Sequence, residues 1–94
     1  MNYAVRRSSQ FKRQYKKLLR SGNKRALRAL QRVIKLLVLR ETLPLSLHDH
    51  ELTGALHGLR ECHMLPDWLL IYSVDHNQLV LELFATGTHS ELFR

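Results

Sequence analysis

Apolar residues in the first forty positions recur at helical spacing and predict two amphipathic helices. The first helix follows Ser8 or Ser9 as its N-cap and ends at Gly22, and the second occupies residues 23–40. The short link at 21–23 favours an antiparallel pair with a common core. The inward-facing side chains are Phe11, Tyr15, Leu18 and Leu19 in the first helix and Leu27, Leu30, Ile34, Leu37 and Val38 in the second.

From residue 59 onward the apolar positions follow the pattern of strands instead of helices. The segment 68–74 is apolar on both faces, as expected of a central strand. A short strand at 2–7 extends the sheet, and residues 41–58 are predicted to be a loop. The other strands are predicted at 59–65 and 79–87, with a turn at 75–78 between the last two.

The order of these elements, β-α-α-β-β-β, predicts a single α+β domain over residues 1–94. Its antiparallel sheet of about four strands carries the two helices on one face. No apolar run approaches the about 18 residues that a membrane span requires. The single cysteine, Cys62, cannot form an internal disulfide, and the N-terminus lacks the apolar core of a secretory signal, which fits a cytoplasmic protein.

Charge is distributed very unevenly along the chain. Residues 1–40 contain thirteen Lys or Arg and no acidic residue, whereas residues 41–94 contain two basic residues against eight acidic ones. Such a field favours a polyanionic partner, and nucleic acid is the most common one. An acidic protein partner is an alternative, and a solvated helical face is the purely structural explanation.

The histidines are candidates for chemistry, because imidazole titrates nearest to neutral pH and suits general acid and base work. The chain contains His48, His50, His57, His63, His76 and His89. His48 and His50 are two residues apart, a spacing that also fits a metal ion with His63, Asp67 or His89 as further ligands. No CxxC or HExxH frame accompanies them, so the metal interpretation is the weaker one.

The predicted strand at 59–65 separates two sets of side chains. A period of two places Arg60, Cys62 and Met64 on one face and Glu61 and His63 on the other. Cys62 and Met64 are therefore expected in the core, and His63 points away from them.

Further polar and aromatic side chains fall at the ends of predicted strands. Pro66 fixes the backbone just before Asp67 and Trp68, which lie at the start of one strand. Trp68 there either packs in the core or stacks on a nucleic-acid base. Gly87 permits a turn that brings His89 back over the sheet, and Phe93 is either a terminal plug or a second stacking surface. Together with the basic helices, these residues indicate a nucleic-acid site.

Three segments resemble the RelE superfamily of toxins from toxin–antitoxin systems, and most closely its YafQ branch. They are "DHELTG" (49–54), "GLRECHMLPDWLLIY" (58–72) and "TGTHSELF" (86–93), and their composite pattern H…PDW…Y…GTHxxLF is specific. The resemblance implies a microbial-ribonuclease-like fold. It also implies a metal-independent endoribonuclease, without a cofactor, that cleaves messenger RNA in the ribosomal A site.

The resemblance also implies the residues of the site, position by position. The catalytic residues would be His50, His63, Asp67 and His89, and the substrate contacts would be Arg60, Trp68 and Phe93. His89 would be the principal acid, the other three would supply or orient the base, and Arg60 would hold the phosphate. The residues of the basic face expected to contact ribosomal RNA are Lys12, Arg13, Lys16, Lys17, Arg20, Lys24, Arg25 and Arg28.

The expected partners follow from the same family. A cognate DinJ- or RelB-like antitoxin would wrap the toxin, cover the site and form a neutralised complex. Operator DNA would be contacted only through that antitoxin, and no membrane is involved.

Two other functions are compatible with the residues. A non-catalytic ribosome- or nucleic-acid-binding module explains the basic segment but leaves the histidines without a role. A metal-dependent hydrolase would use His48, His50 and His63.

Overall fold

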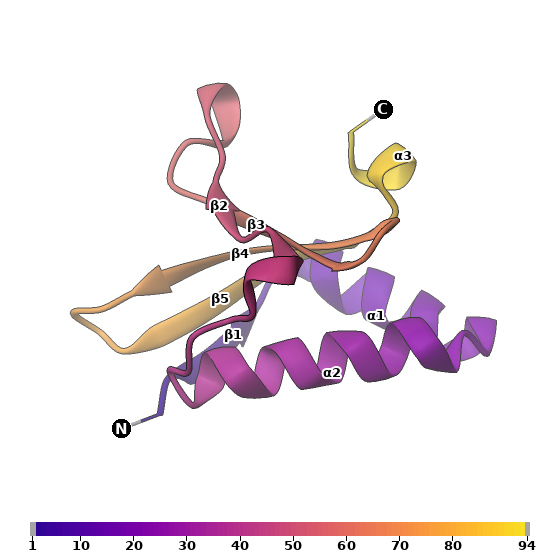
Figure 1. Ribbon diagram of the computed structural model, residues 1–94, viewed down its shortest axis with the longest axis horizontal. Helices are drawn as coiled ribbons and strands as arrows, with labels where there is room; N and C mark the ends of the chain where they lie inside the picture. Colours follow the sequence, from indigo (N-terminus) through magenta and orange to yellow (C-terminus); the bar gives the residue numbers. More distant parts are fainter. Residues whose placement is uncertain (1, 94) are drawn as a thin grey trace.

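Two helices form one layer of the molecule, and a mixed sheet that they cover on one face forms the other (Figure 1). The computed structural model describes residues 2–93. Its strands are β1 (Ala4–Arg7), β2 (His50–Glu51), β3 (Arg60–Leu65), β4 (Trp68–Asp75) and β5 (Val80–Gly87). Its helices are α1 (Ser9–Ser21), α2 (Lys24–Val38) and α3 (His89–Leu92), with 3₁₀ turns η1 (Leu45–Leu47) and η2 (Gly54–Leu56).

The strand order in the sheet is β1-β5-β4-β3-β2. Strands β3, β4 and β5 form the predicted antiparallel meander, and β1 pairs with β5 in parallel. The predicted α+β class and the order of the predicted elements are therefore confirmed. The sheet differs from the prediction of about four antiparallel strands, because it has five strands and its β1–β5 pair is parallel. The predicted loop at 41–58 was wrong in one detail, because it contains the edge strand β2, antiparallel to β3. Two exposed residues carry no periodic signal, so a strand this short cannot be found from the pattern.

The ends of α1 lie where the sequence predicted them, whereas α2 ends at Val38, before the predicted end at residue 40. The Ser8 Oγ accepts a hydrogen bond from the backbone N–H of Phe11, so Ser8 and not Ser9 is the N-cap of α1. Gly22 ends α1 with φ of 75°, in the left-handed region that glycine tolerates best. The side chain of Asn23 then caps α2 by accepting from the N–H of Ala26. The break between the helices is thus encoded by three consecutive polar or glycine residues.

The buried stripes of the helices differ slightly from the predicted ones. Leu18 is buried, but Leu19 is 50% exposed, because neighbouring helical residues point about 100° apart. In α2 the fully buried positions include Ala26 and Val33, which the prediction left out, while Leu27 is only partly buried.

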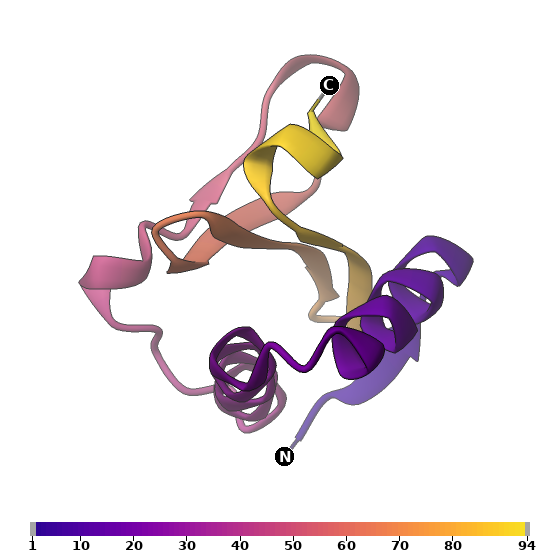
Figure 2. The ribbon, with the colours of Figure 1, turned by 90° about the vertical axis from the view of Figure 1, so that its right-hand side faces the viewer.

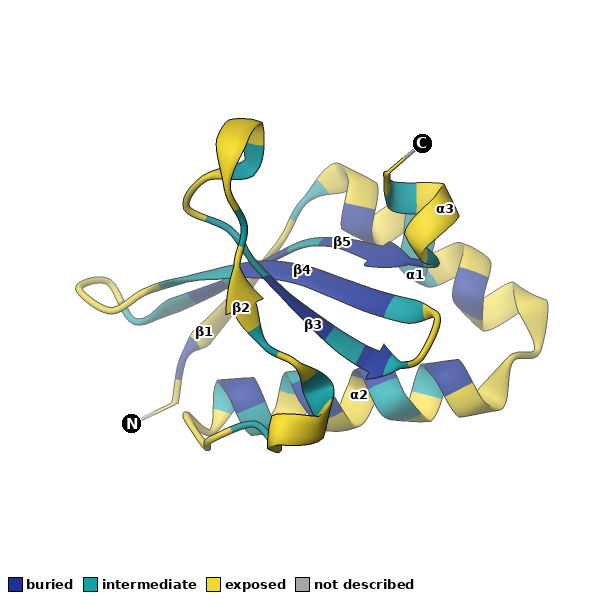
Figure 3. Ribbon diagram, turned by 45° about the horizontal axis from the view of Figure 1, so that its top comes forward, coloured by how far each residue is buried: buried dark blue, intermediate teal, exposed yellow. Residues whose placement is uncertain are grey.

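The main core lies between α1, α2 and the sheet, and residues 69–72 of the central strand β4 are buried (Figure 3). The opposite face of the sheet carries α3 and the connection from β2 to β3, as Figure 2 shows from the side. No helix between residues 2 and 93 is long and apolar enough to cross a membrane.

The single cysteine should be inert in the folded protein. Cys62 has no exposed surface, and its burial, helped by the nearby Asp49 and Glu61 carboxylates, raises the pKa of its thiol from 9.0 to about 12. Since the thiolate is the reactive form, we expect labelling by a disulfide reagent at pH 8 to be about three orders of magnitude slower in the native protein than in the unfolded chain. Following the released thiolate by absorbance, with and without guanidinium, measures this ratio. Equal rates would show that the core opens readily.

Candidate active site

Two of the predicted catalytic residues, His50 and His63, lie on strands, and both are on the face of the sheet opposite α1 and α2. In the register of the sheet, His50 of β2 lies opposite Glu61 of β3, and His63 of β3 lies opposite Leu69 of β4. Leu69 in turn lies opposite Gly87 of β5, two residues before His89. Adjacent strands are roughly 4.8 Å apart, so this register brings segments distant in sequence to one surface. The apolar side chains on this face are Leu69, Ile71 and Ala85, all buried.

Two other imidazoles, those of His48 and His50, lie close to His63. The ring centroid of His63 lies 6.3 Å from that of His50 and 6.0 Å from that of His48. The backbone carbonyl of His48 can only accept, so the 2.7 Å contact from His50 Nδ1 places a proton on Nδ1. The Nε2 lone pair of a neutral His50 is then free to accept a proton. The loop between η1 and β2 therefore determines which nitrogen of His50 can act as a base.

A buried carboxylate, Glu61, contacts His63 directly. Glu61 is only 5% exposed, and its Oε1 lies 3.0 Å from Nε2 of His63. A carboxylate in this position accepts the Nε2 proton, orients the ring and leaves Nδ1 facing away from Glu61. The sequence placed Glu61 on the correct face but gave it no role. The sequence carried no signal for this role, because a carboxylate needs a partner only once it is buried, and the burial of Glu61 is a property of the folded sheet.

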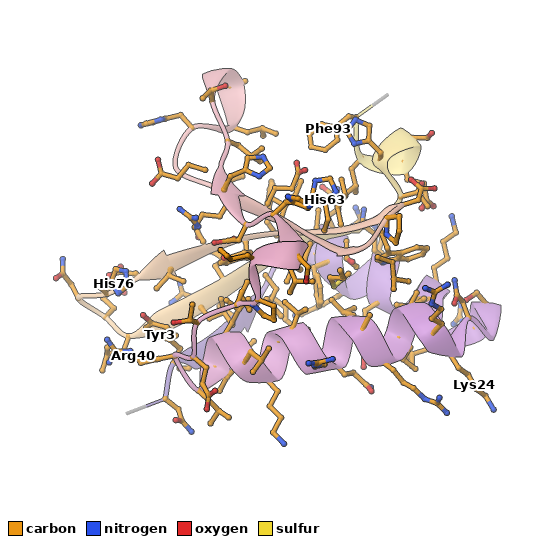
Figure 4. All side chains as sticks on the ribbon, in the orientation of Figure 1. Tyr3, Lys24, Arg40, His63, His76 and Phe93 are labelled. Atoms are coloured by element: carbon orange, nitrogen blue, oxygen red, sulfur yellow. The ribbon has the colours of Figure 1, made fainter. Side chains whose placement is uncertain are left out.

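The helix α3 holds His89 and Phe93 over the end of β5. The Thr88 hydroxyl accepts from the N–H of Glu91, and the Glu91 carboxylate accepts from the N–H of Thr88, which completes a capping box. These hydrogen bonds, together with the ammonium of Lys17 at 3.1 Å, lower the pKa of Glu91. The rings of His89 and Phe93 lie 5.0 Å apart between centroids. Figure 4 shows Phe93 and His63 on the same side of the sheet, away from α2.

The structure does not bring every predicted site residue to this face. Trp68 is two residues from Leu70 on β4, so both side chains point to the face of the sheet that the helices cover. The indole N–H of Trp68 donates to Thr86 Oγ1 at 3.1 Å, beside α1. Asp67 is exposed in the turn between β3 and β4. The guanidinium of Arg60 donates to Asp49 at 2.8 Å, so this arginine is engaged by an acidic side chain. The roles given to these three residues stay predictions.

Asp49 connects two strands, and the sequence gave no reason to single it out. Its carboxylate accepts from Nε and Nη2 of Arg60 and, through its other oxygen, from the hydroxyl of the buried Tyr72. Burial and the adjacent Asp49 carboxylate raise the pKa of Tyr72 far above its usual range. These contacts hold the loop before β2 against β3 and β4, and so they position the neighbouring His50.

Replacing Asp49 with Asn should destabilise the protein, because the amide cannot accept from both partners as the carboxylate does. We expect a loss of about 1–3 kcal/mol in the free energy of unfolding. Urea unfolding at pH 7 measures it. Glu51→Gln is the matched control, since Glu51 is exposed and 3.7 Å from Arg60, and it should change the free energy by less than about 0.5 kcal/mol. Equal losses in both variants would contradict the role of Asp49.

The residues named for the metal-dependent alternative lie near one another, but they do not form a ligand set. Over residues 2–93 there is no group of three or more His, Cys, Asp or Glu side chains arranged to hold a metal ion. The hydrogen bond from His50 to the His48 carbonyl and the contact of His63 with Glu61 engage one nitrogen of each ring.

Comparison with known proteins agrees with this fold. Residues 3–94 match the family model described as bacterial toxin of type II toxin–antitoxin system, YafQ. The mRNA interferase toxin YafQ of Escherichia coli strain K12 is 37% identical over 93 residues, which cover 95% of this chain and 98% of that protein.

Solved structures give the same result. A YafQ variant from E. coli superposes with a TM-score of 0.87 at 29% identity, covering 98% of this chain and 99% of the other. YafQ in an E. coli DinJ–YafQ complex gives 0.86 at 30% identity with the same coverage. A metal-bound toxin from Helicobacter pylori gives 0.85 at 35% identity, covering 99% and 100%. The chain therefore belongs to the YafQ family of bacterial toxins of type II toxin–antitoxin systems.

Proposed function

We propose that this toxin is an endoribonuclease, an mRNA interferase that cuts translated messenger RNA in the ribosomal A site by metal-independent acid–base catalysis. The observation that carries the proposal is the pairing of His50 and His63, with Glu61 behind His63, on the face of the sheet that also carries α3. Relatives that cover nearly all of the chain are named mRNA interferases, which supports the same activity.

The proposed reaction uses the RNA's own 2′-hydroxyl as nucleophile. A base removes the 2′-proton, the 2′-oxygen bonds to phosphorus, and the bond to the 5′-oxygen breaks as an acid protonates that oxygen. His50 and His63 supply the base, since each ring can present an unprotonated nitrogen. His89 supplies the proton for the leaving oxygen from the opposite side of the face.

The remaining predicted residues have supporting roles in this proposal. Phe93 stacks on a base beside the cut and is 37% exposed, so its ring is available. Asp67, in its exposed turn, helps to orient the histidines that act as the general base. Trp68 and Arg60 would need to act from the other face or after a local rearrangement, because Thr86 and Asp49 hold their polar atoms.

The basic face has the role of placing this site on the ribosome. The side chains proposed to contact ribosomal phosphates are exposed on α1 and on the first half of α2. Electrostatic binding of this kind releases counterions, so ribosome association should weaken steeply with salt. Binding to the ribosome supplies the positioning that a small, open site lacks.

A cognate antitoxin is the expected protein partner. Two relatives of known structure are YafQ in complex with DinJ, which supports a DinJ-like partner for this toxin. We propose that it covers the histidine face and neutralises the toxin, and that operator DNA binds only through the antitoxin.

Mapping cut sites by primer extension tests the proposed activity. The toxin is induced with two copies of one transcript, one translated and one with its start codon removed. Cuts at codon-linked positions in the translated copy alone support the proposal. Ribosome binding without cuts would instead favour the non-catalytic module, which the paired histidines argue against.

A chelator test separates the two catalytic mechanisms. Cleavage on programmed ribosomes is measured with a chelator that removes zinc and copper but leaves the magnesium that ribosomes need. Retained cleavage supports acid–base catalysis. Loss that is restored by added metal would support the metal-dependent hydrolase.

A further inference from the structure

Three arginines of α2 line one hollow on the surface. Arg25, Arg28 and Arg32 are spaced three and four residues apart, which places them on one stripe of the helix, and all three are exposed. They face a hollow of about 440 Å³ between α2 and η1. The ion pairs found between residues 2 and 93 involve none of the three. Their charge is therefore available to an anion.

This hollow continues into a second one that contains two of the histidines. The second hollow, of about 420 Å³, includes His48 and His63. Both hollows are lined by Ser46, Leu47, Met64 and Leu65, which lie on η1 and at the end of β3. Together they form a path, here called the arginine groove, around the β2–β3 edge of the sheet from α2 to the imidazoles.

The dimensions of the groove fit a nucleic-acid strand. A helical rise of 1.5 Å per residue places Arg25 and Arg32 about 10 Å apart along the axis of α2. A stacked strand carries one phosphate per roughly 3.4 Å, so this row spans about three phosphates. Guanidinium groups are well suited to such contacts, since their planar donors pair with phosphate oxygens.

We propose that the arginine groove binds the stretch of the substrate strand that adjoins the cut phosphate, and so guides it to His63. The proposal rests on the proposed function for the identity of the histidine site. It reassigns Arg25 and Arg28 from ribosomal RNA to the substrate strand and adds Arg32 to them. Lys24 and the basic residues of α1 remain assigned to ribosomal RNA. Binding of ribosomal RNA in the same groove is the outcome that would overturn it.

Two double variants test the groove. Arg28→Gln with Arg32→Gln removes two charges from it. Arg6→Gln with Arg7→Gln removes two charges from β1, the opposite edge strand of the sheet. All four side chains are exposed, so both variants should fold, which circular dichroism checks.

The first measurement is binding to RNA without the ribosome. A fluorescent single-stranded RNA of roughly ten nucleotides, a length within the range that a small domain covers, is titrated at several salt concentrations. We expect the groove variant to bind at least about fivefold more weakly, with a salt slope reduced by about 1.4, or 0.7 for each lost phosphate contact. The β1 variant should keep the wild-type slope. Equal effects in the two variants, or none in either, would overturn the proposal.

The second measurement separates substrate RNA from ribosomal RNA. We expect the groove variant to bind ribosomes without messenger as the wild type does, yet to cut bound messenger more slowly. An equal loss in ribosome affinity would assign the arginines to ribosomal RNA and overturn the groove as a substrate path. If the wild type cuts nothing but the groove variant still loses RNA affinity, the proposed function fails while the groove remains. If the wild type cuts and the groove variant binds and cuts equally well, the groove fails alone.

Discussion

Replacing His89 with Gln should reduce single-turnover cleavage of ribosome-bound messenger RNA by roughly 10²- to 10⁴-fold, the usual effect of removing one general acid. Gln has a similar reach and can donate a hydrogen bond, but it cannot transfer a proton at neutral pH. The capping box that holds α3 uses Thr88 and Glu91, not His89, so the helix should remain in place. Quenched reactions with the toxin in excess over programmed ribosomes give the rate.

Ribosome affinity is the control for this variant. Co-sedimentation of His89→Gln with ribosomes should match the wild type, because His89 is not among the residues proposed to contact ribosomal RNA. Parallel losses in affinity and rate would mean that His89 serves binding and not proton transfer. Ser90→Ala is a matched surface change on the same helix, and it should leave both quantities unchanged.

Much of the fold was predictable because its elements are long and regularly patterned. The two helices each run over three turns with clear caps, and the meander strands are six to eight residues long. Strand β2 was missed because its two residues are defined only by pairing with β3. The orientation of Leu19 was also missed, since one residue of rotation decides which of two adjacent leucines faces the sheet.

The candidate site was predictable only in part. His50 and His63 were predicted because histidine is the residue type best suited to acid–base catalysis near neutral pH. The register of β2 with β3 brings their rings together. Asp49 and Glu61 were not predicted, because an acidic residue in a charged chain is ordinary until its burial is known. Burial is a property of the packed sheet, and it turns Glu61 from a surface charge into a partner for His63.

A double-mutant cycle on Glu61 and His63 should show that the two residues act as one unit. His63→Ala should lower single-turnover cleavage by roughly 10²-fold or more, through loss of a general base. Glu61→Gln should lower it by about 10-fold, because the neutral amide fixes the tautomer and the orientation of the His63 ring less firmly than the carboxylate does. The double variant should be no slower than His63→Ala alone, since Glu61 has nothing to orient once the ring is gone.

Glu82→Gln is the matched control for this cycle. Glu82 lies on β5 and is paired in register with Ser73, and the hydrogen bonds and ion pairs found within residues 2–93 give it no imidazole partner. It should cut at the wild-type rate. Multiplicative losses in the double variant would show that Glu61 acts independently of His63, for example by repelling or directing the RNA phosphate. Because Glu61 is buried, urea unfolding of each variant is needed to confirm that the rates compare folded proteins. If the losses remain non-additive among variants of equal stability, Glu61 acts on cleavage through the His63 imidazole.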